Sequence, residues 1–414
     1  MTEVVVVGAG PAGIAAACRA AESGATVTLL DYNPYLGGQI WRHGAGYSVP
    51  IKAKRWFNRL DKADVTVRTG ETVIDIIGSA VQVQTEAGSS YSIAFDKLIL
   101  ATGSRELFIP FPGWTLPNVM GAGGAQALLK AGMPVKGLRV VVGGSGPLLF
   151  AVAGNLAKAG AKIVCIAEQT GQMRLAKFAL GTLRYSPSKM LQGVGYTWHY
   201  FPAPYRLNTW VKEARGDSQV REVVLTDGKK QRTEPCDMVA CAFGLVPNVE
   251  LASLVGCKQE NGRAVVDLLQ RTPINQSIFC AGEITGIGGV DLAITEGEIA
   301  GLAAAGNEKA AKILVSKRSK QLRFARLLDN CFALKDRLRD LPTDDTIICR
   351  CEDVTYGELK NQTDQRSAKL YTRCGMGPCQ GRICSSTLAY LLGWQSNSVH
   401  PPAVPTKIGA FLNQ

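Results

Sequence analysis

Five cysteines lie close together near the C-terminal end of this 414-residue chain. Cys349 and Cys351 form a Cys-x-Cys pair, and Cys374, Cys379 and Cys384 follow after a gap long enough for a helix. In a reducing compartment such thiolates bind metal more readily than they form disulfides. The spacing therefore predicts a metal or iron–sulfur site, and an iron–sulfur cluster would make electron transfer the chemistry of this region.

A glycine-rich motif opens the chain. Residues 4–7 have the composition of a buried strand, and Gly8-Ala-Gly10-Pro-Ala-Gly13 follows at once. An alanine-rich helix over residues 14–23 and a strand over residues 26–30 come next, and Asp31 closes that strand. In this context the glycines bring the backbone close to a pyrophosphate, and the acid holds the ribose hydroxyls. The motif therefore predicts a dinucleotide site.

Three later segments fit the same site. Residues 37–39 form a loop that could pass beside a flavin, and residues 98–103 form a buried strand that ends in a small, polar turn. Residues 279–283 repeat that pattern before an apolar helix over residues 292–305, whose N-terminus would favour a second anionic group. We expect the cofactor to contact Gly8, Gly10, Pro11, Ala12, Gly13, Asp31, Gly38, Gln39, Ala101, Thr102, Gly103, Gly282 and Glu283.

A second unit repeats the pattern with two changes. A strand over residues 140–142 leads into Gly144-Ser-Gly146-Pro-Leu-Leu149, followed by a helix and another strand. Leu149 stands where the third glycine would be, and the acid, Glu168, comes one residue late. We therefore expect an altered approach of helix and strand. We interpret this unit as a dinucleotide-like domain that need not bind NAD(P)H, so that NAD(P), ATP and no ligand all remain open.

Residues 1–310 resemble the two-domain flavoprotein disulfide reductases, in which a nicotinamide-type domain is inserted into an FAD domain. The resemblance implies an α/β fold with two Rossmann-like domains. The FAD-binding domain would cover residues 1–115 and 245–310, and the inserted NAD(P)-like domain residues 116–244. Neither Cys-x-x-Cys nor Cys-x-x-x-x-Cys lies beside a flavin segment in this body, so disulfide reductase activity is not expected.

The whole chain is more specifically similar to the α subunits of hetero-oligomeric amine-oxidising flavoenzymes: opine oxidase, hydroxyproline and proline dehydrogenase, hydrogen cyanide synthase and, more distantly, sarcosine oxidase. The similarity lies in residues 37–42, 242–248, 281–292, 349–354 and 373–382. It implies FAD (or another nucleotide in some members), a [2Fe-2S] cluster, and FMN at the interface with a β subunit that resembles D-amino-acid or glycine oxidases. A small ferredoxin-like γ subunit is a further partner to consider, and a quinone or cytochrome would accept the electrons.

The same resemblance implies a small helical [2Fe-2S] domain of the BFD-like type over residues 346–395. A basic linker or helix at residues 311–345 would precede it, and a tail at residues 396–414 would follow. The family pattern implies Cys349, Cys351, Cys379 and Cys384 as cluster ligands, with Cys374 as the spare thiol. Zinc is the alternative metal, since the same sulfurs could bind it tetrahedrally.

Local signals predict helices in this C-terminal region. Thr355-x-x-Glu358 predicts a capping box at the start of a short helix. Pro378 predicts the first turn of the last helix, and Gly393 predicts its end. Residues five apart on a regular helix are turned by about 140° from each other. Cys379 should therefore lie at the very start of that helix or just before it.

The net charge of +12 is concentrated in residues 309–339, which contain ten Lys or Arg residues against two Asp. We interpret this segment as a surface for an acidic partner or an anionic cofactor, with a solvated helix face as the alternative. No aromatic-interleaved motif accompanies the charge, so nucleic acid is not expected. Apolar runs are shorter than the roughly 18–20 residues of a membrane span, and no cleavable signal precedes the first strand. We expect a cytoplasmic protein that does not span a membrane, with peripheral association at the inner membrane face as an option.

Groups for acid–base catalysis are scarce. His43, His199 and His400 are isolated in the sequence, and no Ser-His-Asp set or paired acidic motif occurs, so we assign no catalytic residue. We expect an electron-transfer subunit of a flavin-dependent dehydrogenase or oxidase that acts on the C–N bond of an opine, an imino acid or an amino acid such as hydroxyproline. The alternatives are a self-contained NAD(P)H-dependent flavin/iron–sulfur oxidoreductase and a non-catalytic nucleotide-binding scaffold for the β subunit.

Overall fold

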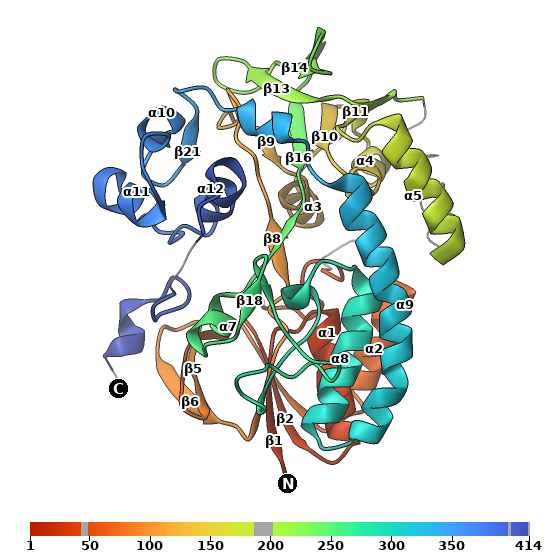
Figure 1. Cartoon of the computed structure of the whole chain (residues 1–414), viewed down its shortest axis with the longest axis vertical. Coiled ribbons are helices and arrows are strands. Elements are labelled where there is room, and N and C mark those ends of the chain that lie inside the picture. Colours follow the sequence, from red (N-terminus) through yellow and green to blue (C-terminus); the bar gives the residue numbers. More distant parts are fainter. Residues whose placement is uncertain (43–48, 186–201, 396–398, 413–414) are drawn as a thin grey trace. The chain divides into compact units, whose positions relative to one another are not determined.

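The structure, a computed structural model, describes residues 1–42, 49–185, 202–395 and 399–412. Contacts divide the chain into two compact units, and many of their elements are labelled in Figure 1. Each unit contains one five-stranded sheet whose neighbouring strands run parallel, which confirms the expected α/β fold class. Unit 1 consists of Met1–Arg105, Val246–Ala325 and Ser398–Gln414, and unit 2 consists of Glu106–Leu245 and Arg326–Asn397.

The sheet of unit 1 has the strand order β20-β7-β1-β2-β3. Its strands are rich in valine, isoleucine and leucine, as expected for a parallel sheet that is buried on both faces. Because β1 pairs with both β2 and β7, the residues that follow β1 lie at the middle of the sheet edge, where nucleotides bind in such folds. The strands are β1 (Glu3–Val7), β2 (Thr26–Asp31), β3 (Val65–Thr69), β7 (Lys97–Leu100) and β20 (Ile278–Cys280).

Helices α1 (Pro11–Glu22) and α8 (Val290–Ala304) lie side by side in unit 1 (Figure 1). Two glycines on α8 make this packing possible. A Cβ atom on Gly297 would lie 2.0 Å from the carbonyl oxygen of Ala12, and Gly301 meets α1 in the same way one turn later. Nearly every residue of α8 is buried, and its two buried acids, Glu298 and Glu296, pair with Arg19 and Arg318.

Within the described part of the chain, no helix combines the length and the apolar character that a membrane span requires.

The remaining elements of unit 1 lie around its parallel sheet and helices α1 and α8. Helix α9 (Glu308–Phe332) begins in unit 1 and ends in unit 2, and β8 (Ser104–Glu106) and β17 (Leu245–Pro247) lie where the chain passes between the units. The other elements are β4 (Thr72–Ile77), β5 (Ala80–Gln84), β6 (Ser90–Ala94), β18 (Gln259–Glu260), β19 (Arg263–Ala264), α2 (Ile51–Leu60), α7 (Glu250–Leu254), η1 (Glu283–Thr285) and η3 (Ile408–Phe411).

The sheet of unit 2 has the strand order β12-β11-β10-β16-β9, and a three-stranded antiparallel sheet, β13-β14-β15, accompanies it. The parallel strands are β9 (Val119–Gly121), β10 (Arg139–Gly144), β11 (Lys162–Glu168), β12 (Tyr205–Leu207) and β16 (Met238–Ala242). The antiparallel strands are β13 (Trp210–Arg215), β14 (Glu222–Thr226) and β15 (Gln231–Pro235). The helices are α3 (Ala122–Lys130), α4 (Leu148–Lys158) and α5 (Gln172–Tyr185).

The cysteine-rich region belongs to unit 2 and shares its hydrophobic core. The Trp114 indole N–H donates to the carbonyl oxygen of Ile347 at 2.7 Å, and the Thr387 hydroxyl donates to that of Phe108 at 2.8 Å. The shared core includes Trp114, Val141, Trp210, Cys349, Cys374, Cys384 and Leu388. The elements of the region are η2 (Asp336–Asp340), β21 (Ile347–Cys349), β22 (Val354–Thr355), α10 (Tyr356–Leu359), α11 (Gln365–Thr372) and α12 (Cys384–Leu392).

Two of the three local helix signals in this region are confirmed. Thr355 and Glu358 form the predicted capping box at the start of α10. Gly393 ends α12 in the left-handed conformation, with a φ of 73°. Because a glycine adopts this conformation without strain, it stops a helix at little cost.

The predicted start of the last helix at Pro378 is wrong, because α12 begins at Cys384. Gln380 and Gly381 have φ angles of 52° and 75°. A right-handed helix cannot contain residues in this conformation, so the helix begins only after them. Cys379 therefore lies in the loop before α12, as its spacing from Cys384 requires.

The packing of α8 on α1 gives a test of the fold. We expect Gly297→Ala to lower the free energy of unfolding by about 1–3 kcal/mol, because the added methyl group overlaps the α1 backbone. Gly124→Ala is the matched control: no atom lies within 4 Å of its Cβ position in α3, so stability should stay the same or rise. Urea unfolding followed by circular dichroism measures both changes. Equal stability of the two variants would contradict the role of Gly297.

Candidate functional site

The first glycine turn joins β1 to α1 and is tightly enclosed at two of its three glycines. Gly8 has a φ of +104°, and a Cβ atom there would lie 2.4 Å from the carbonyl oxygen of Ala101. A Cβ on Gly13 would lie 1.7 Å from the carbonyl oxygen of Gly8. Gly10 differs, because no atom lies within 4 Å of its Cβ position. This open side of the turn, at the N-terminus of α1, is where a pyrophosphate would fit.

Other predicted cofactor residues lie around this turn. Pro11 is the first residue of α1. A Cβ on Gly38 would lie 3.0 Å from Gly10 Cα, and a Cβ on Gly282 would lie 2.7 Å from Ala12 Cβ. Three segments far apart in the sequence thus meet here, each with a glycine at the closest approach.

Asp31 is buried at the end of β2, beside the same turn. Its Oδ2 atom accepts from the backbone N–H of Ala9 at 2.6 Å, and its Oδ1 atom accepts from that of Asn33 at 2.8 Å. These bonds fix the carboxylate where the ribose of a dinucleotide would lie. Gln39, in contrast, is exposed on the loop that carries Gly38.

Asn248 was outside the predicted cofactor set, yet it holds the turn that follows β7. Its side-chain amide donates to the carbonyl oxygen of Thr102, and its backbone N–H donates to that of Gly103, both at 2.9 Å. The Thr102 hydroxyl donates back to the carbonyl oxygen of Asn248 at 2.6 Å. Nothing in the local spacing indicates this contact, since 146 residues separate the two partners.

Two acidic residues lie near Gly282. Glu283 accepts from the hydroxyl of Ser104, and burial raises the pKa of Glu283. Glu296, which the sequence reasoning missed, accepts from the backbone N–H of Gly282 at 3.1 Å and pairs with Arg318 at 2.8 Å. Burial raises the pKa of Glu296, and Arg318 opposes that rise. Glu296 and Glu298 within an otherwise apolar helix were the signal that could have revealed this contact, because buried acids need partners.

The second glycine turn, between β10 and α4, starts from the same backbone geometry. A Cβ on Gly144 would lie 2.0 Å from the carbonyl oxygen of Ala242, as Gly8 approaches the strand beside it in unit 1. Leu149, at the third glycine position, is buried in the core of unit 2. The tight strand end is therefore retained, whereas the helix start is built differently.

The late position of Glu168 in the sequence is compensated by a bulge. Strand β11 skips one residue between its pairings with Val140 and Val141, so that Glu168 lies opposite Gly144. Its Oε2 atom accepts from the backbone N–H of Gly146 at 2.7 Å, and burial raises its pKa. The acid thus stands beside the second turn as Asp31 stands beside the first.

Residues 332–335, which we call the covering segment, lie over the second turn. A Cβ on Gly146 would lie 3.5 Å from Cγ of Phe332, whereas the equivalent position at Gly10 is open. The Ser145 hydroxyl donates to the carbonyl oxygen of Phe332 at 2.9 Å. The protein's own chain therefore lies in van der Waals contact with the side of the turn that is open at Gly10.

The covering segment is held on more than one side. The buried Gln169 donates through Nε2 to the carbonyl oxygen of Ala333 and accepts through Oε1 from the backbone N–H of Lys335, both at 3.2 Å. Phe178 packs edge-on against Phe332, with 4.8 Å between ring centroids. Polar and aromatic contacts together fix this segment in the second turn.

Three of the five C-terminal thiols form a compact buried group. The Sγ atoms of Cys349, Cys374 and Cys384 lie within 4.8 Å of one another. They come from the end of β21, the loop after α11 and the start of α12. The contact with Cys374, followed by burial, raises the pKa of the Cys384 thiol. In the described part of the chain, this is the one group of three or more such side chains arranged to hold a metal ion.

The other two thiols face outward. Cys351 is exposed, Cys379 is partly exposed, and the Cys351 thiol lies within hydrogen-bonding reach of the Cys379 side chain. A Cβ on Gly377 would lie 2.3 Å from Cys351 Cβ, so only glycine fits there. Backbone N–H groups, including that of Gly375, point at the sulfur of Cys349. Donors of this kind stabilise metal-bound thiolates, so these residues fit either iron or zinc.

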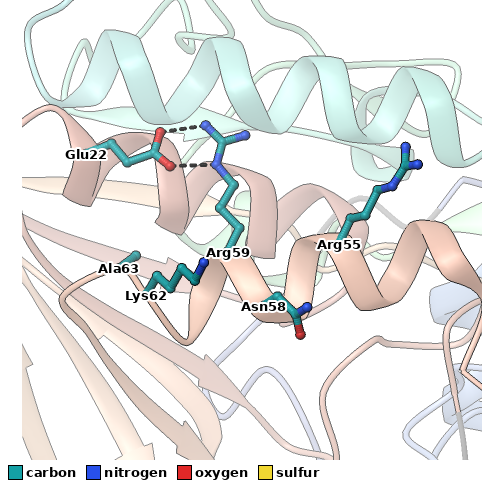
Figure 2. A pocket seen from close by; sticks show the side chains of 6 residues that line it. All are labelled: Glu22, Arg55, Asn58, Arg59, Lys62 and Ala63. Carbon is teal, nitrogen blue, oxygen red and sulfur yellow. Dashed lines mark hydrogen bonds and ion pairs between the residues drawn. The ribbon is translucent and has the colours of Figure 1, made fainter.

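A surface hollow of about 350 Å³ lies apart from these sites. Glu22 and Arg59 form a bidentate ion pair on its rim, with distances of 2.5 and 2.6 Å (Figure 2). Glu22 ends the helix that begins just after Gly10, so the hollow and the glycine turn lie at opposite ends of α1. The lining residues are Glu22, Arg55, Asn58, Arg59, Lys62 and Ala63.

Of the three histidines, His400 is exposed, and His43 and His199 lie outside the described residues. His400 lies in the C-terminal segment of unit 1, far along the chain from the glycine motif and after the last of the five clustered cysteines. The candidate site therefore rests on the glycine turns and the thiols described above.

The family comparison bears on the two glycine turns. The model of the pyridine nucleotide-disulphide oxidoreductase family matches residues 2–298. The chain belongs to this family. Membership implies FAD, and the open turn at Gly10, with Asp31 beside it, fits the pyrophosphate and ribose of that cofactor.

Individual relatives cover nearly the whole chain. One subunit of opine oxidase from Agrobacterium tumefaciens (strain Ach5) is 31% identical over 449 residues, which span 98% of this chain and 88% of the relative. The HcnB subunit of hydrogen cyanide synthase from Pseudomonas aeruginosa is 31% identical over 422 residues, spanning 92% and 90%. The predicted resemblance to subunits of such flavoenzymes is confirmed.

A solved structure shares the fold. The L-proline dehydrogenase from P. horikoshii superimposes with a TM-score of 0.69 over 100% of this chain and 79% of that one. The two sequences are 20% identical, so this likeness concerns the fold alone.

A substitution at Gly10 distinguishes an effect on folding from an effect on cofactor binding. A valine side chain there meets no protein atom within 4 Å of its Cβ, so Gly10→Val should leave the unfolding midpoint of the cofactor-free chain unchanged. The same side chain would occupy the pyrophosphate space, and bound FAD should fall by at least about tenfold, a loss of about 1.4 kcal/mol. FAD released by denaturation, measured per chain, tests this. Full FAD content in the variant would contradict the assignment, and Gly124→Val, at an open glycine of α3 away from the turn, is the matched control.

Proposed function

We propose that this chain is the electron-transfer α subunit of a hetero-oligomeric dehydrogenase or oxidase that oxidises the C–N bond of an opine, an imino acid or an amino acid such as hydroxyproline. Its cofactors are FAD and a [2Fe-2S] cluster, with FMN at the interface with a partner subunit. Support comes from relatives that are themselves named as subunits, one of opine oxidase and one of hydrogen cyanide synthase. The substrate pocket lies in the partner, which agrees with the absence of an assigned catalytic residue in this chain.

The observation that carries the proposal is the difference between the two glycine turns. The first is open at Gly10, and the second is filled at Gly146 by Phe332. An enzyme that takes electrons from NAD(P)H needs the second turn for the nucleotide. Its own chain stands there instead, which favours an electron donor other than NAD(P)H and argues against the self-contained NAD(P)H-dependent alternative.

The residues of unit 1 have distinct roles in this proposal. The N–H groups of the first turn bind the pyrophosphate, and Asp31 holds the ribose hydroxyls. Asn248 and Glu296 position the neighbouring turns through the hydrogen bonds already described. FAD would supply two-electron chemistry when bound, and the protein supplies its orientation. The FAD-binding domain of this proposal covers residues 1–115 and 245–310.

The cysteines of unit 2 hold the cluster in this proposal. Cys349, Cys351, Cys379 and Cys384 are its ligands, and the backbone N–H groups around Cys349 offset the charge of the thiolates. A [2Fe-2S] cluster would transfer electrons one at a time towards a quinone or cytochrome. Zinc in the same thiols would instead make the region structural.

The partner subunits remain those that the resemblance implies: a β subunit similar to D-amino-acid or glycine oxidases, and a ferredoxin-like γ subunit. Helix α9 offers a basic surface for the β subunit, because Arg323 and Arg326 are exposed. Arg318 on the same helix is committed to Glu296 inside unit 1. We place the assembly in the cytoplasm, where a reducing environment keeps the thiols available for metal.

An anaerobic titration of the purified chain tests the electron donor. We expect NADH and NADPH to leave the flavin oxidised, because the covering segment fills the second turn. A panel of opines, imino acids and amino acids should reduce the flavin and the cluster only when the chain is co-expressed with the proteins encoded beside it. Visible absorbance follows both centres, and the Gly10→Val chain is the flavin-free control.

Rapid bleaching of the flavin in the isolated chain by NADH or NADPH would overturn this proposal and favour the self-contained oxidoreductase. A chain purified with ADP or ATP and no flavin would instead favour the nucleotide-binding scaffold.

The basic face of α9 is tested by charge reversal. We expect Arg323→Glu with Arg326→Glu to weaken co-purification with the β subunit at least about tenfold, since the new glutamates would face an acidic partner and like charges slow association. Lys229→Glu with Lys230→Glu, in the exposed turn between β14 and β15, is the control for net charge. Unchanged co-purification of the α9 variant would remove this surface from the proposal.

A further inference from the structure

The thiol region holds five cysteines, whereas a [2Fe-2S] cluster takes four ligands. Burial divides the five into two sets. Cys349, Cys374 and Cys384 are 1%, 2% and 2% exposed, whereas Cys351 and Cys379 face outward. Cys374, which the family pattern leaves as a spare, therefore belongs to the inner set in this structure.

The three inner sulfurs lie close enough together for any two of them to serve as neighbouring metal ligands after a small movement. All three Sγ atoms lie within 4.8 Å of one another. Two thiolates on one tetrahedral metal with bonds of about 2.3 Å are separated by about 3.8 Å. A small side-chain rotation therefore brings any two of Cys349, Cys374 and Cys384 to this separation.

The backbone directs Cys374 inward. Arg373 ends α11 in the left-handed conformation, with a φ of 63°, and Gly375 follows at 82°. Hydrogen bonding from the Gly375 backbone acts on the Cys349 thiol, so the loop that carries Cys374 lies beside that thiol. A Cβ on Gly375 would also lie 3.9 Å from the sulfur of Cys384.

No spare thiol is grouped with the outer cysteines, Cys351 and Cys379, in the described part of the chain. Cys351 and Cys379 contact each other, and Gly377 fills the space beside Cys351. Cys374 is grouped with the two inner thiols and with neither outer one. The structure therefore places Cys374 with the inner ligand positions.

We propose that Cys374 is a competent metal ligand, and that Cys349, Cys374 and Cys384 share two inner ligand positions while Cys351 and Cys379 fill the two outer ones. This inference rests on the metal centre of the proposed function, and it adds a reserve ligand for the inner side of that centre.

Serine substitutions in the full chain, purified anaerobically, test this arrangement through iron and acid-labile sulfide per chain and the electron paramagnetic resonance of the reduced cluster. Cys349→Ser and Cys384→Ser are each expected to keep most of the iron, with shifted g values, because Cys374 takes the vacant position. The double variant Cys374→Ser with Cys384→Ser should hold roughly tenfold less iron.

Outer-position variants and controls complete the set. Cys351→Ser and Cys379→Ser should lose iron even though Cys374 is present. Cys374→Ser alone should keep its iron, as should Cys236→Ser, a buried cysteine of unit 2 outside the group. Far-UV circular dichroism identifies any variant that has failed to fold.

Loss of iron from Cys384→Ser equal to that from the double variant would overturn the inference, as would complete loss from Cys374→Ser alone. If the unmodified chain contains zinc and no iron or sulfide, the proposed function fails, and the zinc content of the same variants decides the ligand question. A chain that binds neither metal overturns both.

Discussion

The close approach of the backbone at the end of strand β1 is the constraint on which unit 1 depends. Side chains at Gly8 and Gly13 would overlap backbone atoms, so strand, turn and helix fit together only because both Cβ atoms are missing. Gly297 extends the same constraint to the packing of α8 on α1. With the turn locked by its first and third glycines, the second, Gly10, remains open to a pyrophosphate. One backbone arrangement thus stabilises the fold and creates the cofactor site.

In unit 2 the equivalent turn, between β10 and α4, contacts the covering segment of the same chain. Gly144 keeps the tight strand end and Glu168 keeps the place of the acid, but Phe332 fills the space over Gly146. The covering segment continues into the thiol region: Tyr390 on α12 donates through its hydroxyl to the carbonyl oxygen of Lys335 at 2.8 Å. A surface that binds a nucleotide in related folds here anchors the helix that begins with Cys384.

Local features of this structure could be predicted from the sequence, because they depend on neighbouring residues. Both strand–turn–helix units, the Thr355 capping box and the end of α12 at Gly393 are of this kind. The start of α12 could not be placed, because proline at a helix start is a statistical preference and the left-handed Gln380 decides otherwise. The bulge that realigns Glu168 and the contact of Phe332 with Gly146 depend on strand pairing and on residues far apart in the chain. Spacing alone carries no information about such contacts.

A metal bound by the thiol group would couple its binding to the stability of unit 2. Burial raises the pKa of Cys349, and the neighbouring Cys374 and burial raise that of Cys384, so neither thiol ionises readily without compensation. A bound metal supplies the missing positive charge and stabilises the thiolates. These cysteines also belong to the hydrophobic core that contains Val141 and Trp210 of the second sheet. Free energy gained on binding a metal would therefore be shared by the whole of unit 2, including the covering segment.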